Sequence, residues 1–243
     1  MSKRYYKLNE DYFNVIDTEA KAYWLGYIYA DGGITIGRPW VVQLQSKDKW
    51  FLDNIKSAMQ AENPIKNITN GSGFTPGTKH YRLNLYSKKL STTLFNWKGI
   101  SEEINMPNID KHLKRHFIRG FFDGDGSVYT WQKKGVTKHK GYTYKLADGT
   151  KKFVPYNIPR EYPYSYEAIE CDIICCNNMQ EDIVELLKLA NIKTRIKKSK
   201  SEHMNYVVVT NKPAVKRFYE YLYTDATIYL PRKHKVFTTH YAP

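Results

Sequence analysis

The sequence predicts an α+β protein made of two pseudo-symmetric halves, each with the element order αββαββα, which pack together through one helix from each half. The first observation is an internal repeat: AYWLGYIYADGGI at residues 22–34 aligns on its glycines with FIRGFFDGDGSV at residues 117–128, at an offset of 94 residues. The second is that the same order of strands and helices is predicted after each copy. Such a repeat indicates two copies of one supersecondary unit.

The first half, residues 1–105, begins with the motif helix. Two strands are predicted next, at about residues 34–36 and 41–45, and then an amphipathic helix in DKWFLDNIKSAMQ, whose apolar residues recur at helical spacing. Strands in IKNIT and HYRLNLYS follow, separated by a glycine-rich connection at residues 71–77. A short helix near KKLSTTLFNW ends the half.

The second half, residues 117–243, repeats this order after a connection at residues 106–116, a proline turn that leads into the second motif helix. Its predicted elements are strands at about residues 127–132 and 168–175, a helix in MQEDIVELLKLA, strands in KTRIKK and NYVVVTN, and a helix in PAVKRFYEYLY. An insertion at residues 133–165 separates its first two strands.

The insertion combines a turn signal with a loop signal. Asp148-Gly149, within YTYKLADGTKKFV, strongly indicates a tight hairpin turn. The proline- and tyrosine-rich stretch NIPREYPYSY that follows predicts a surface loop. Two interpretations stay open for this segment: a plain surface excursion, or a contact with nucleic acid through its basic and aromatic residues.

The charge of the chain indicates a polyanionic partner. Of 243 residues, 38 are Lys or Arg and 24 are Asp or Glu, which gives a formal net charge of +14 and a pI near 9.4. Positive charge on this scale favours nucleic acid, and 42% hydrophobic residues exclude wholesale disorder. No apolar run approaches the roughly 18 residues of a membrane span, and the N-terminus lacks the apolar core of a signal peptide. We therefore expect an intracellular protein that is neither secreted nor bound to a membrane.

The cysteines indicate no metal or disulfide chemistry. Cys171, Cys175 and Cys176 lie in one short apolar run, and a zinc site would need a second, spaced pair of ligands. We interpret all three as buried reduced thiols, in agreement with an intracellular protein.

Small residues within the two motif helices predict a close helix crossing. Gly26 and Ala30 are four residues apart, as are Gly120 and Gly124, so each pair lies on one helix face. Glycine inside a helix costs about 1 kcal/mol relative to alanine, so its repetition here needs a steric reason. Two helix backbones in direct contact would provide one.

Asp31 and Asp125 follow these small residues and are predicted to meet at the ends of the two helices. Two carboxylates side by side at helix C-termini are unfavourable unless they are protonated or bridged by a cation. Oxygen ligands in a basic protein favour Mg²⁺, and the arrangement suits metal-assisted hydrolysis of phosphodiesters. The alternative is that the aspartates simply end the helices and the glycines cap them. The repetition of the same glycine and aspartate pattern at equivalent positions in both halves argues against this alternative.

The two motif strings resemble the signature helices of the LAGLIDADG homing endonucleases in their single-chain, two-motif form, over about Asp17 to Phe237. The resemblance implies that each half carries a curved antiparallel sheet and that the halves form a saddle over a long site on double-stranded DNA. It implies a monomer without an obligate protein partner that cuts both strands, with Asp31 and Asp125 as catalytic, metal-binding residues. The backbone at Ala30 is given no role in metal binding.

The same resemblance implies supporting residues near the metals: a polar side chain on the second strand and a lysine late in each half. Gln43 or Gln45 matches the first role in the N-terminal half, and Asp172 matches it in the C-terminal half. Lys233, within LPRKHKVF, matches the late lysine. The N-terminal half has SEEINMP where a similar lysine is expected, and Lys98 lies nearby but out of register. Two outcomes therefore stay open: equal cutting of the two strands, or a preference for nicking one of them.

Alternation in two strands predicts the surface that contacts DNA. In KHYRLNLYSK one face is apolar, and the other carries the predicted contacts His80, Arg82, Asn84 and Tyr86. In KTRIKK the predicted contacts are Lys193, Arg195 and Lys197. A solvated strand face is the alternative for any one of these residues. His112 and His116 lack a third ligand, so a surface or phosphate contact is expected of them.

A second class of function stays open beside the nuclease. Proteins of the same fold can bind nucleic acid without cutting it, as intron RNA maturases or transcriptional regulators. Retention of both Asp31 and Asp125 favours the nuclease, because a binding protein has no use for two crowded carboxylates.

Overall fold

The computed structural model describes residues 6–69, 77, 79–99 and 104–241. Most of the predicted glycine-rich connection at residues 71–77 and the first part of SEEINMP lie outside these residues. None of the helices in the described part of the chain is both long and apolar enough to cross a membrane.

The N-terminal half has the predicted order of elements. They are α1 (Glu19–Asp31), β1 (Gly33–Thr35), β2 (Val41–Ser46), α2 (Lys49–Ala58), β3 (Ile65–Thr69), β4 (Lys79–Tyr86) and α3 (Lys88–Lys98). The strands form one antiparallel sheet in the order β1-β2-β4-β3. Val42, Leu44, Leu83 and Leu85 are fully buried on one face of this sheet, which α2 covers. Thr18 and Ser87 cap α1 and α3 with their side-chain oxygens.

The C-terminal half repeats this order and adds one helix. Its elements are α4 (Lys111–Asp125), β5 (Gly126–Lys145), β6 (Lys151–Cys176), α5 (Asn177–Leu189), β7 (Arg195–Lys198), β8 (Met204–Thr210), α6 (Lys212–Tyr223) and α7 (Pro231–Tyr241). The sheet order is β5-β6-β8-β7. The sequence analysis did not predict α7, although Pro231 stands at its first position, where proline starts helices. Helix α4 begins at Lys111, so the end of the expected connection is helical.

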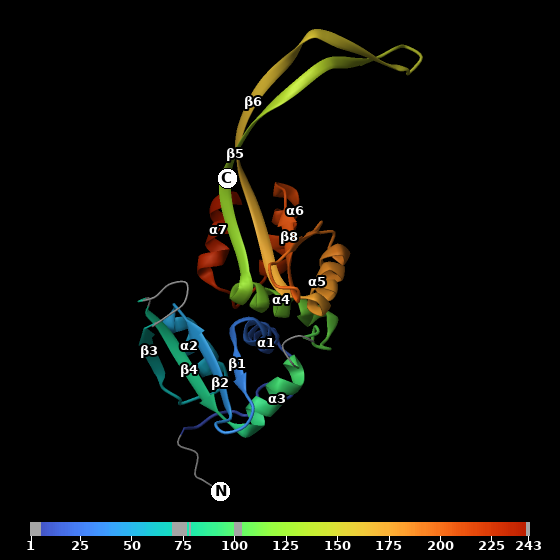
Figure 1. The fold of residues 1–243 in the computed structure, drawn as a ribbon. Coiled ribbons are helices and arrows are strands. Elements are labelled where there is room, and N and C mark those ends of the chain that lie inside the picture. The colour runs from blue at the N-terminus through green and yellow to red at the C-terminus, as the bar shows by residue number, and fades with distance from the viewer. Residues whose placement is uncertain (1–5, 70–76, 78, 100–103, 242–243) are drawn as a thin grey trace.

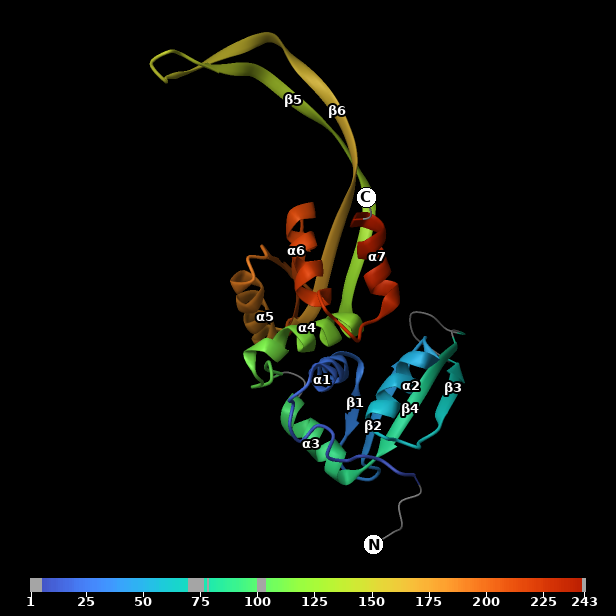
Figure 2. The same ribbon diagram turned by 180° about the vertical axis from the view of Figure 1, so that it is seen from behind.

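The insertion forms a long two-stranded arm. From Trp131 and Ala168 outward, β5 and β6 pair only with each other, and we call residues 131–168 the arm. Figures 1 and 2 show it extending far from the body of the protein. Asp148 and Gly149 lie in its terminal turn, where Gly149 has a φ of +87°.

The predicted loop NIPREYPYSY is wrong, because residues 157–166 all belong to β6. Each strand of a two-stranded ribbon has one edge that faces solvent. A proline fits such a strand wherever its nitrogen lies on that edge, because no hydrogen bond between the strands is lost there. The prolines that favoured a loop are therefore compatible with this strand.

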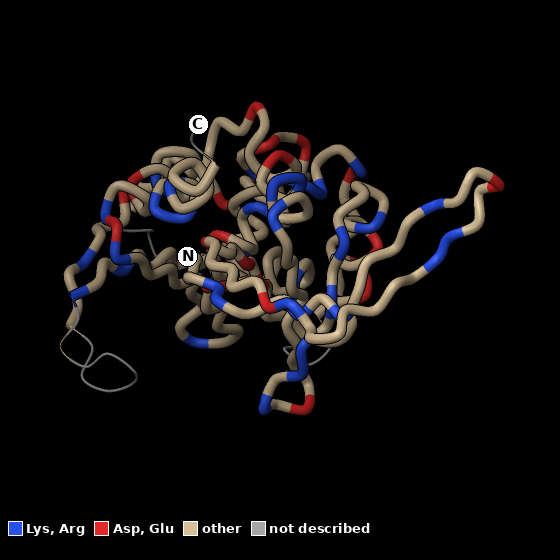
Figure 3. Tube along the Cα trace, turned by 90° about the horizontal axis from the view of Figure 1, so that it is seen from above, with Lys and Arg blue, Asp and Glu red and all other residues tan. Residues whose placement is uncertain are grey.

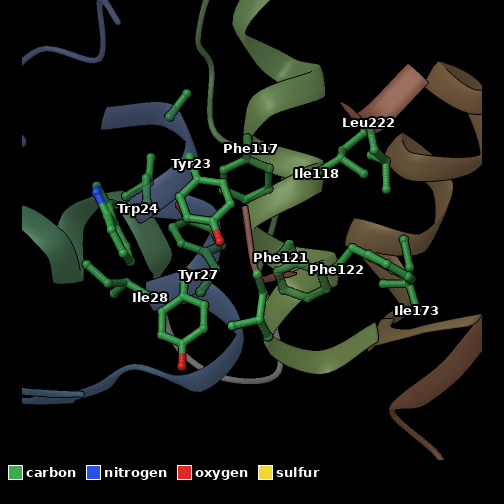
Figure 4. Packing of buried hydrophobic residues seen from close by; sticks show 14 of the residues in the cluster. Tyr23, Trp24, Tyr27, Ile28, Phe117, Ile118, Phe121, Phe122, Ile173 and Leu222 are labelled. Carbon is green, nitrogen blue, oxygen red and sulfur yellow. The ribbon is translucent and has the colours of Figure 1, made fainter. Parts of the chain in front are cut away.

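The close crossing of α1 and α4 is confirmed. A Cβ atom on Gly26 would lie 2.0 Å from the carbonyl oxygen of Phe117, and one on Gly120 would lie 1.9 Å from that of Tyr23. Figure 4 shows aromatic side chains of both helices packed around this contact. The two halves are joined through α1 and α4 (Figure 1). As predicted, the three cysteines are buried and form no disulfide.

Candidate active site

The carboxylates of Asp31 and Asp125 lie at the ends of the two crossing helices. Asp31 is the last residue of α1 and Asp125 is the last residue of α4. A Cβ atom on Gly124 would lie 3.6 Å from Cγ of Asp31, so the residue before Asp125 packs against Asp31. Asp31 is exposed and Asp125 is half-buried. The fold therefore brings together the two acids that the sequence analysis selected.

Both carboxylates lie where negative charge is unfavourable. Burial raises the pKa of Asp125 to about 6, and the neighbouring carboxylate of Asp31 adds to this rise. Protein atoms packed around the carboxylate of Asp31 also raise its pKa by removing water from it, although the residue as a whole reaches solvent. The C-terminal ends of two helices add negative partial charge at the same place. Nearby cations are needed to keep both groups ionised.

Lys98 supplies one of these cations. It is the last residue of α3, and its Nζ donates to the carbonyl oxygens of Ile28 and Gly32 at the end of α1, each at 3.3 Å. Its positive charge opposes the rise in the pKa of both Asp31 and Asp125. The expectation that the N-terminal half has no lysine in register is wrong, because α3 returns to the end of α1 and presents Lys98 there.

Lys233 supplies the equivalent cation in the C-terminal half. It is buried at the start of α7, and its Nζ donates to the carbonyl oxygens of Phe122 and Gly126, both at 2.5 Å. These two residues follow Ile28 and Gly32 by the repeat offset of 94 residues. Burial lowers the pKa of Lys233 to about 8, which the acids nearby counteract.

Strand register separates the two glutamine candidates. Gly33 pairs with Gln43 in the first sheet, and Ser127, the repeat counterpart of Gly33, pairs with Asp172 in the second. Gln43 is therefore the structural counterpart of Asp172. Gln45 lies two residues further along β2, beyond the last pair with β1, and lines a surface hollow together with Asp31.

This hollow crosses the boundary between the halves. It has a volume of about 410 Å³ and is lined by Tyr27, Asp31, Gln45, Ser46, Lys47, His80 and Arg232. Arg232 belongs to α7 of the C-terminal half, and its charge opposes the rise in the pKa of Asp31. The sequence analysis did not select Arg232 or Lys47. The available signal for Arg232 was its position directly before Lys233 in LPRKHKVF.

The predicted polar row on β4 lies on the face opposite the core. Tyr86 is exposed, and His80, Arg82 and Asn84 are partly exposed. Across the sheet, Gln43 pairs with Asn84 and Gln45 pairs with Arg82. One polar face therefore carries both the β4 row and the glutamines.

The predicted row in the second sheet differs in detail. Strand β7 begins at Arg195, so Lys193 lies before the strand and outside the row. Arg195 forms an ion pair with Glu170 at 2.9 Å, and the Nζ of Lys197 lies 5.5 Å from the ring centroid of Tyr206. Register places Arg195 and Lys197 on the face of Asp172.

The sequence analysis missed a buried acid beside the site. Asp123 is fully buried and accepts hydrogen bonds from the hydroxyls of Tyr23 at 2.8 Å and Tyr223 at 3.0 Å, and from the backbone N–H of Leu230 at 2.7 Å. Burial raises the pKa of Asp123 to about 6. These bonds tie α4 to α1 and to the start of α7, and so position Lys233. An acid directly after Phe121 and Phe122 in the second motif was the available signal.

A second buried polar group involves Arg119, which is fully buried in α4. It donates to Glu19 at 2.6 Å and to the carbonyl oxygens of Ile228 and Leu222. Its Nη1 lies 2.9 Å from Nδ1 of His116. The expected surface or phosphate contact of His116 is wrong, because this ring is 7% exposed and accepts from a buried guanidinium.

His116 makes the free energy of unfolding depend on pH. Burial and Arg119 lower the pKa of His116 from 6.5 to about 4. Between these pH values the unfolded chain binds a proton at His116 that the folded chain does not. The contribution of His116 to the free energy of unfolding is therefore fully present above pH 6.5 and is lost as the pH falls toward 4. We expect the His116→Gln variant to lose roughly 2–3 kcal/mol less of its free energy of unfolding than the wild type over this pH range. Urea unfolding across this pH range measures it.

His112→Gln is the matched control for this prediction, since His112 lies exposed on the same helix. Its unfolding profile should follow that of the wild type. A His116→Gln profile that also follows the wild type would contradict the prediction.

The oxygen donors at the site fit Mg²⁺. In the described part of the chain, no three or more His, Cys, Asp or Glu side chains are grouped so that they could hold a metal ion. Mg²⁺ needs only one or two carboxylates, since it retains water and binds substrate phosphate. Asp31 and Asp125 provide such a pair, and their raised pKa values are those of acids that a cation would stabilise.

Comparisons with known proteins place the fold. No protein-family model and no curated protein matches the chain. Among solved structures, the I-SmaMI LAGLIDADG homing endonuclease bound to cleaved DNA is similar with a TM-score of 0.53 and 13% identity, over 92% of this chain and 87% of that one. The homing endonuclease I-WcaI, bound to its DNA recognition sequence, has a TM-score of 0.53 and 12% identity over 93% and 90%. LAGLIDADG homing endonuclease I-GzeII, in complex with its DNA target, has a TM-score of 0.52 and 12% identity over 89% and 87%.

These similarities define the class of structure. The chain has the two-half α+β fold of the LAGLIDADG homing endonucleases, as the motif helices predict. At 12–13% identity the likeness concerns the fold alone.

Proposed function

We propose that the chain is a site-specific DNA endonuclease that depends on a divalent metal and cuts both strands of a long double-stranded target. The observation that carries this proposal is the pair Asp31 and Asp125 at adjoining helix ends, each helix end held by its own lysine. The solved structures of the same fold are DNA-bound homing endonucleases, which supports the same substrate class.

Each residue has a proposed role. Asp31 and Asp125 would hold Mg²⁺, and the ion would supply an activated water and stabilisation of the leaving oxygen of the phosphodiester. Lys98 and Lys233 lower the energy of the ionised carboxylates and fix the ends of the two helices. Gln43, Asp172 and, in the hollow, Gln45 orient groups at the metal through hydrogen bonds.

The equivalent placement of Lys98 and Lys233 supports cutting of both strands over the nicking preference that the sequence left open. The two halves provide matched helix ends, matched lysines and the matched pair Gln43 and Asp172. One chain therefore carries all parts of the site, which supports action as a monomer.

The proposed DNA surface is the polar face of the two sheets. It carries the row His80, Arg82, Asn84 and Tyr86, together with Arg195 and Lys197, while Lys193 contacts phosphate from the loop before β7. Figure 3 shows Lys and Arg distributed over both halves of the protein. Affinity for DNA that is carried by such Lys and Arg contacts falls steeply with salt.

We propose residues 1–105 and 117–243 as the two halves, with residues 106–116 between them.

A cleavage assay tests the proposal. Plasmids that carry the DNA flanking the gene of this protein, joined with the gene removed, are incubated with the protein and Mg²⁺ or EDTA, with each strand labelled at its end. We expect cleavage of both strands with Mg²⁺ and none with EDTA. Tight binding to one plasmid without cleavage in Mg²⁺ would instead assign a non-cleaving nucleic-acid-binding protein, such as a maturase or a regulator.

A further inference from the structure

We propose that the arm is a second DNA-binding surface, which contacts duplex DNA beside the target and lengthens the site that the protein covers. This inference rests on the proposed function, because it takes the same DNA as its partner. It adds a surface outside the two sheets and names the face of the arm that binds.

The two faces of the arm differ in charge. The pairs Trp131 with Ala168, Lys133 with Tyr166, Gly135 with Tyr164, Thr137 with Tyr162 and His139 with Arg160 share one face, which we call the aromatic face. The arm holds eight Lys and Arg and three acids. Glu161 and Glu167 lie on the opposite face, and Asp148 lies in the terminal turn. The aromatic face therefore carries cations and no acid.

The aromatic face continues the polar face of the second sheet. Ser127 pairs with Asp172 and Tyr129 pairs with Glu170, and the alternation runs on to His139 before the register first shifts. A duplex that lies on the face of Asp172 therefore meets the aromatic face next along the same two strands. Figures 1 and 2 show the arm as a direct extension of these strands.

The side chains of the aromatic face are exposed and ordered by contacts within the arm. Tyr162, Tyr164 and Tyr166 are 47%, 38% and 50% exposed. The rings of Tyr164 and Tyr166 stack with centroids 5.8 Å apart, and Tyr164 also covers Gly135, where a Cβ atom would lie 2.5 Å from its hydroxyl oxygen. Tyrosine side chains held in this way can contact a partner with their hydroxyl groups and their ring faces, and they lose little side-chain entropy on binding.

Nucleic acid is the partner that these features favour. A two-stranded ribbon fits the major groove of DNA, and Lys and Arg beside it can bind phosphates. The main alternative for an exposed ribbon is strand addition by another protein or a second copy of the chain. Pro155, Pro159 and Pro163 lie along β6, where they remove backbone donors and disfavour such pairing.

The root of the arm is anchored to the body through α7. Nδ1 of His240, in α7, lies 2.6 Å from Oε2 of Glu167 on the face opposite the aromatic residues. Helix α7 also packs on β5 and carries Lys233. The direction of the arm is therefore set by the helix that holds the end of α4.

A pair of matched variants tests the arm. Lys133→Ala with Arg160→Ala removes two cations from the aromatic face, and Lys134→Ala with Lys138→Ala removes two from the opposite face. The probe is a long fluorescent duplex of mixed sequence, titrated at several salt concentrations. We expect the first variant to bind more weakly and to reduce the slope of log affinity against log salt by about 2, since each phosphate contact contributes roughly 0.9. The second variant should keep the wild-type slope.

Hydroxyl-radical footprinting on any bound plasmid site gives an independent measurement. The aromatic-face variant should lose protection at one end of the site and retain protection at the centre. Equal slopes and equal footprints for both variants would overturn the proposal, as would a change in oligomeric state confined to the aromatic-face variant, or tighter binding of single-stranded RNA than of duplex DNA.

These outcomes separate this inference from the nuclease proposal. A wild type that binds through the arm but never cuts DNA would leave the arm surface supported and the nuclease contradicted. If the wild type cuts DNA and the arm variants bind DNA as the wild type does, the nuclease proposal is supported and the arm surface is contradicted.

Discussion

Replacing either Asp31 or Asp125 by Asn is expected to lower the rate of double-strand cleavage by at least about 100-fold. Loss of residues that only support a metal ligand costs up to roughly 100-fold, and a direct ligand should cost no less. The amide keeps the shape of the side chain but removes the negative charge that holds the cation. The burial that raises the pKa of Asp125 penalises its charge, so its replacement by an amide should not weaken the fold.

Strand-specific end labels on the cleaved DNA measure this effect, and a binding titration in EDTA measures affinity without a divalent metal. We expect affinity within a few-fold of the wild type, because both aspartates repel phosphate and contribute nothing to DNA contacts. Asp53→Asn is the control, since Asp53 is an exposed carboxylate on α2 that pairs with Lys49 at 2.8 Å. Cleavage by Asp31→Asn or Asp125→Asn at the rate of this control would exclude the proposed metal site.

Gly26→Ala and Gly120→Ala are each expected to lower the free energy of unfolding by about 3 kcal/mol or more. The added methyl group would lie 2.0 Å or 1.9 Å from a backbone carbonyl oxygen of the facing helix. A backbone atom cannot turn aside as a side chain can, so the two helices must move apart. Separation of the helices also displaces the aspartates at their ends, and cleavage should fall together with stability.

Gly33→Ala is the matched control for the two glycine variants. Gly33 lies in β1 near the site, and its added Cβ would meet its nearest neighbour, Cβ of Gln43, at 3.7 Å, an ordinary contact. Urea unfolding should place this control close to the wild type. If Gly26→Ala or Gly120→Ala unfolds at the same urea concentration as Gly33→Ala, the close crossing does not limit stability.

Features that depend on local pattern and on repetition can be predicted from the amino-acid sequence of this protein. The order of the strands and helices follows from apolar spacing within short windows, and the burial of Leu83 and Leu85 opposite Arg82 follows from alternation. The repeated Gly–Asp pattern predicted the close crossing, because only a steric demand explains glycine at equivalent places in two helices. Asp31 and Asp125 were found in the same way.

Contacts between residues far apart in the chain become visible only in the folded protein. Lys98 and Lys233 lie at different distances along their halves, and only the return of α3 and α7 to the motif helices makes them equivalent. Pairing across strands separated Gln43 from Gln45 and turned the proline-rich stretch of the arm into a strand. The burial of His116, Arg119 and Asp123 depends on α1, α6 and α7 closing over one face of α4. Contacts over such separations leave no periodicity in the sequence, so pattern alone could not predict them.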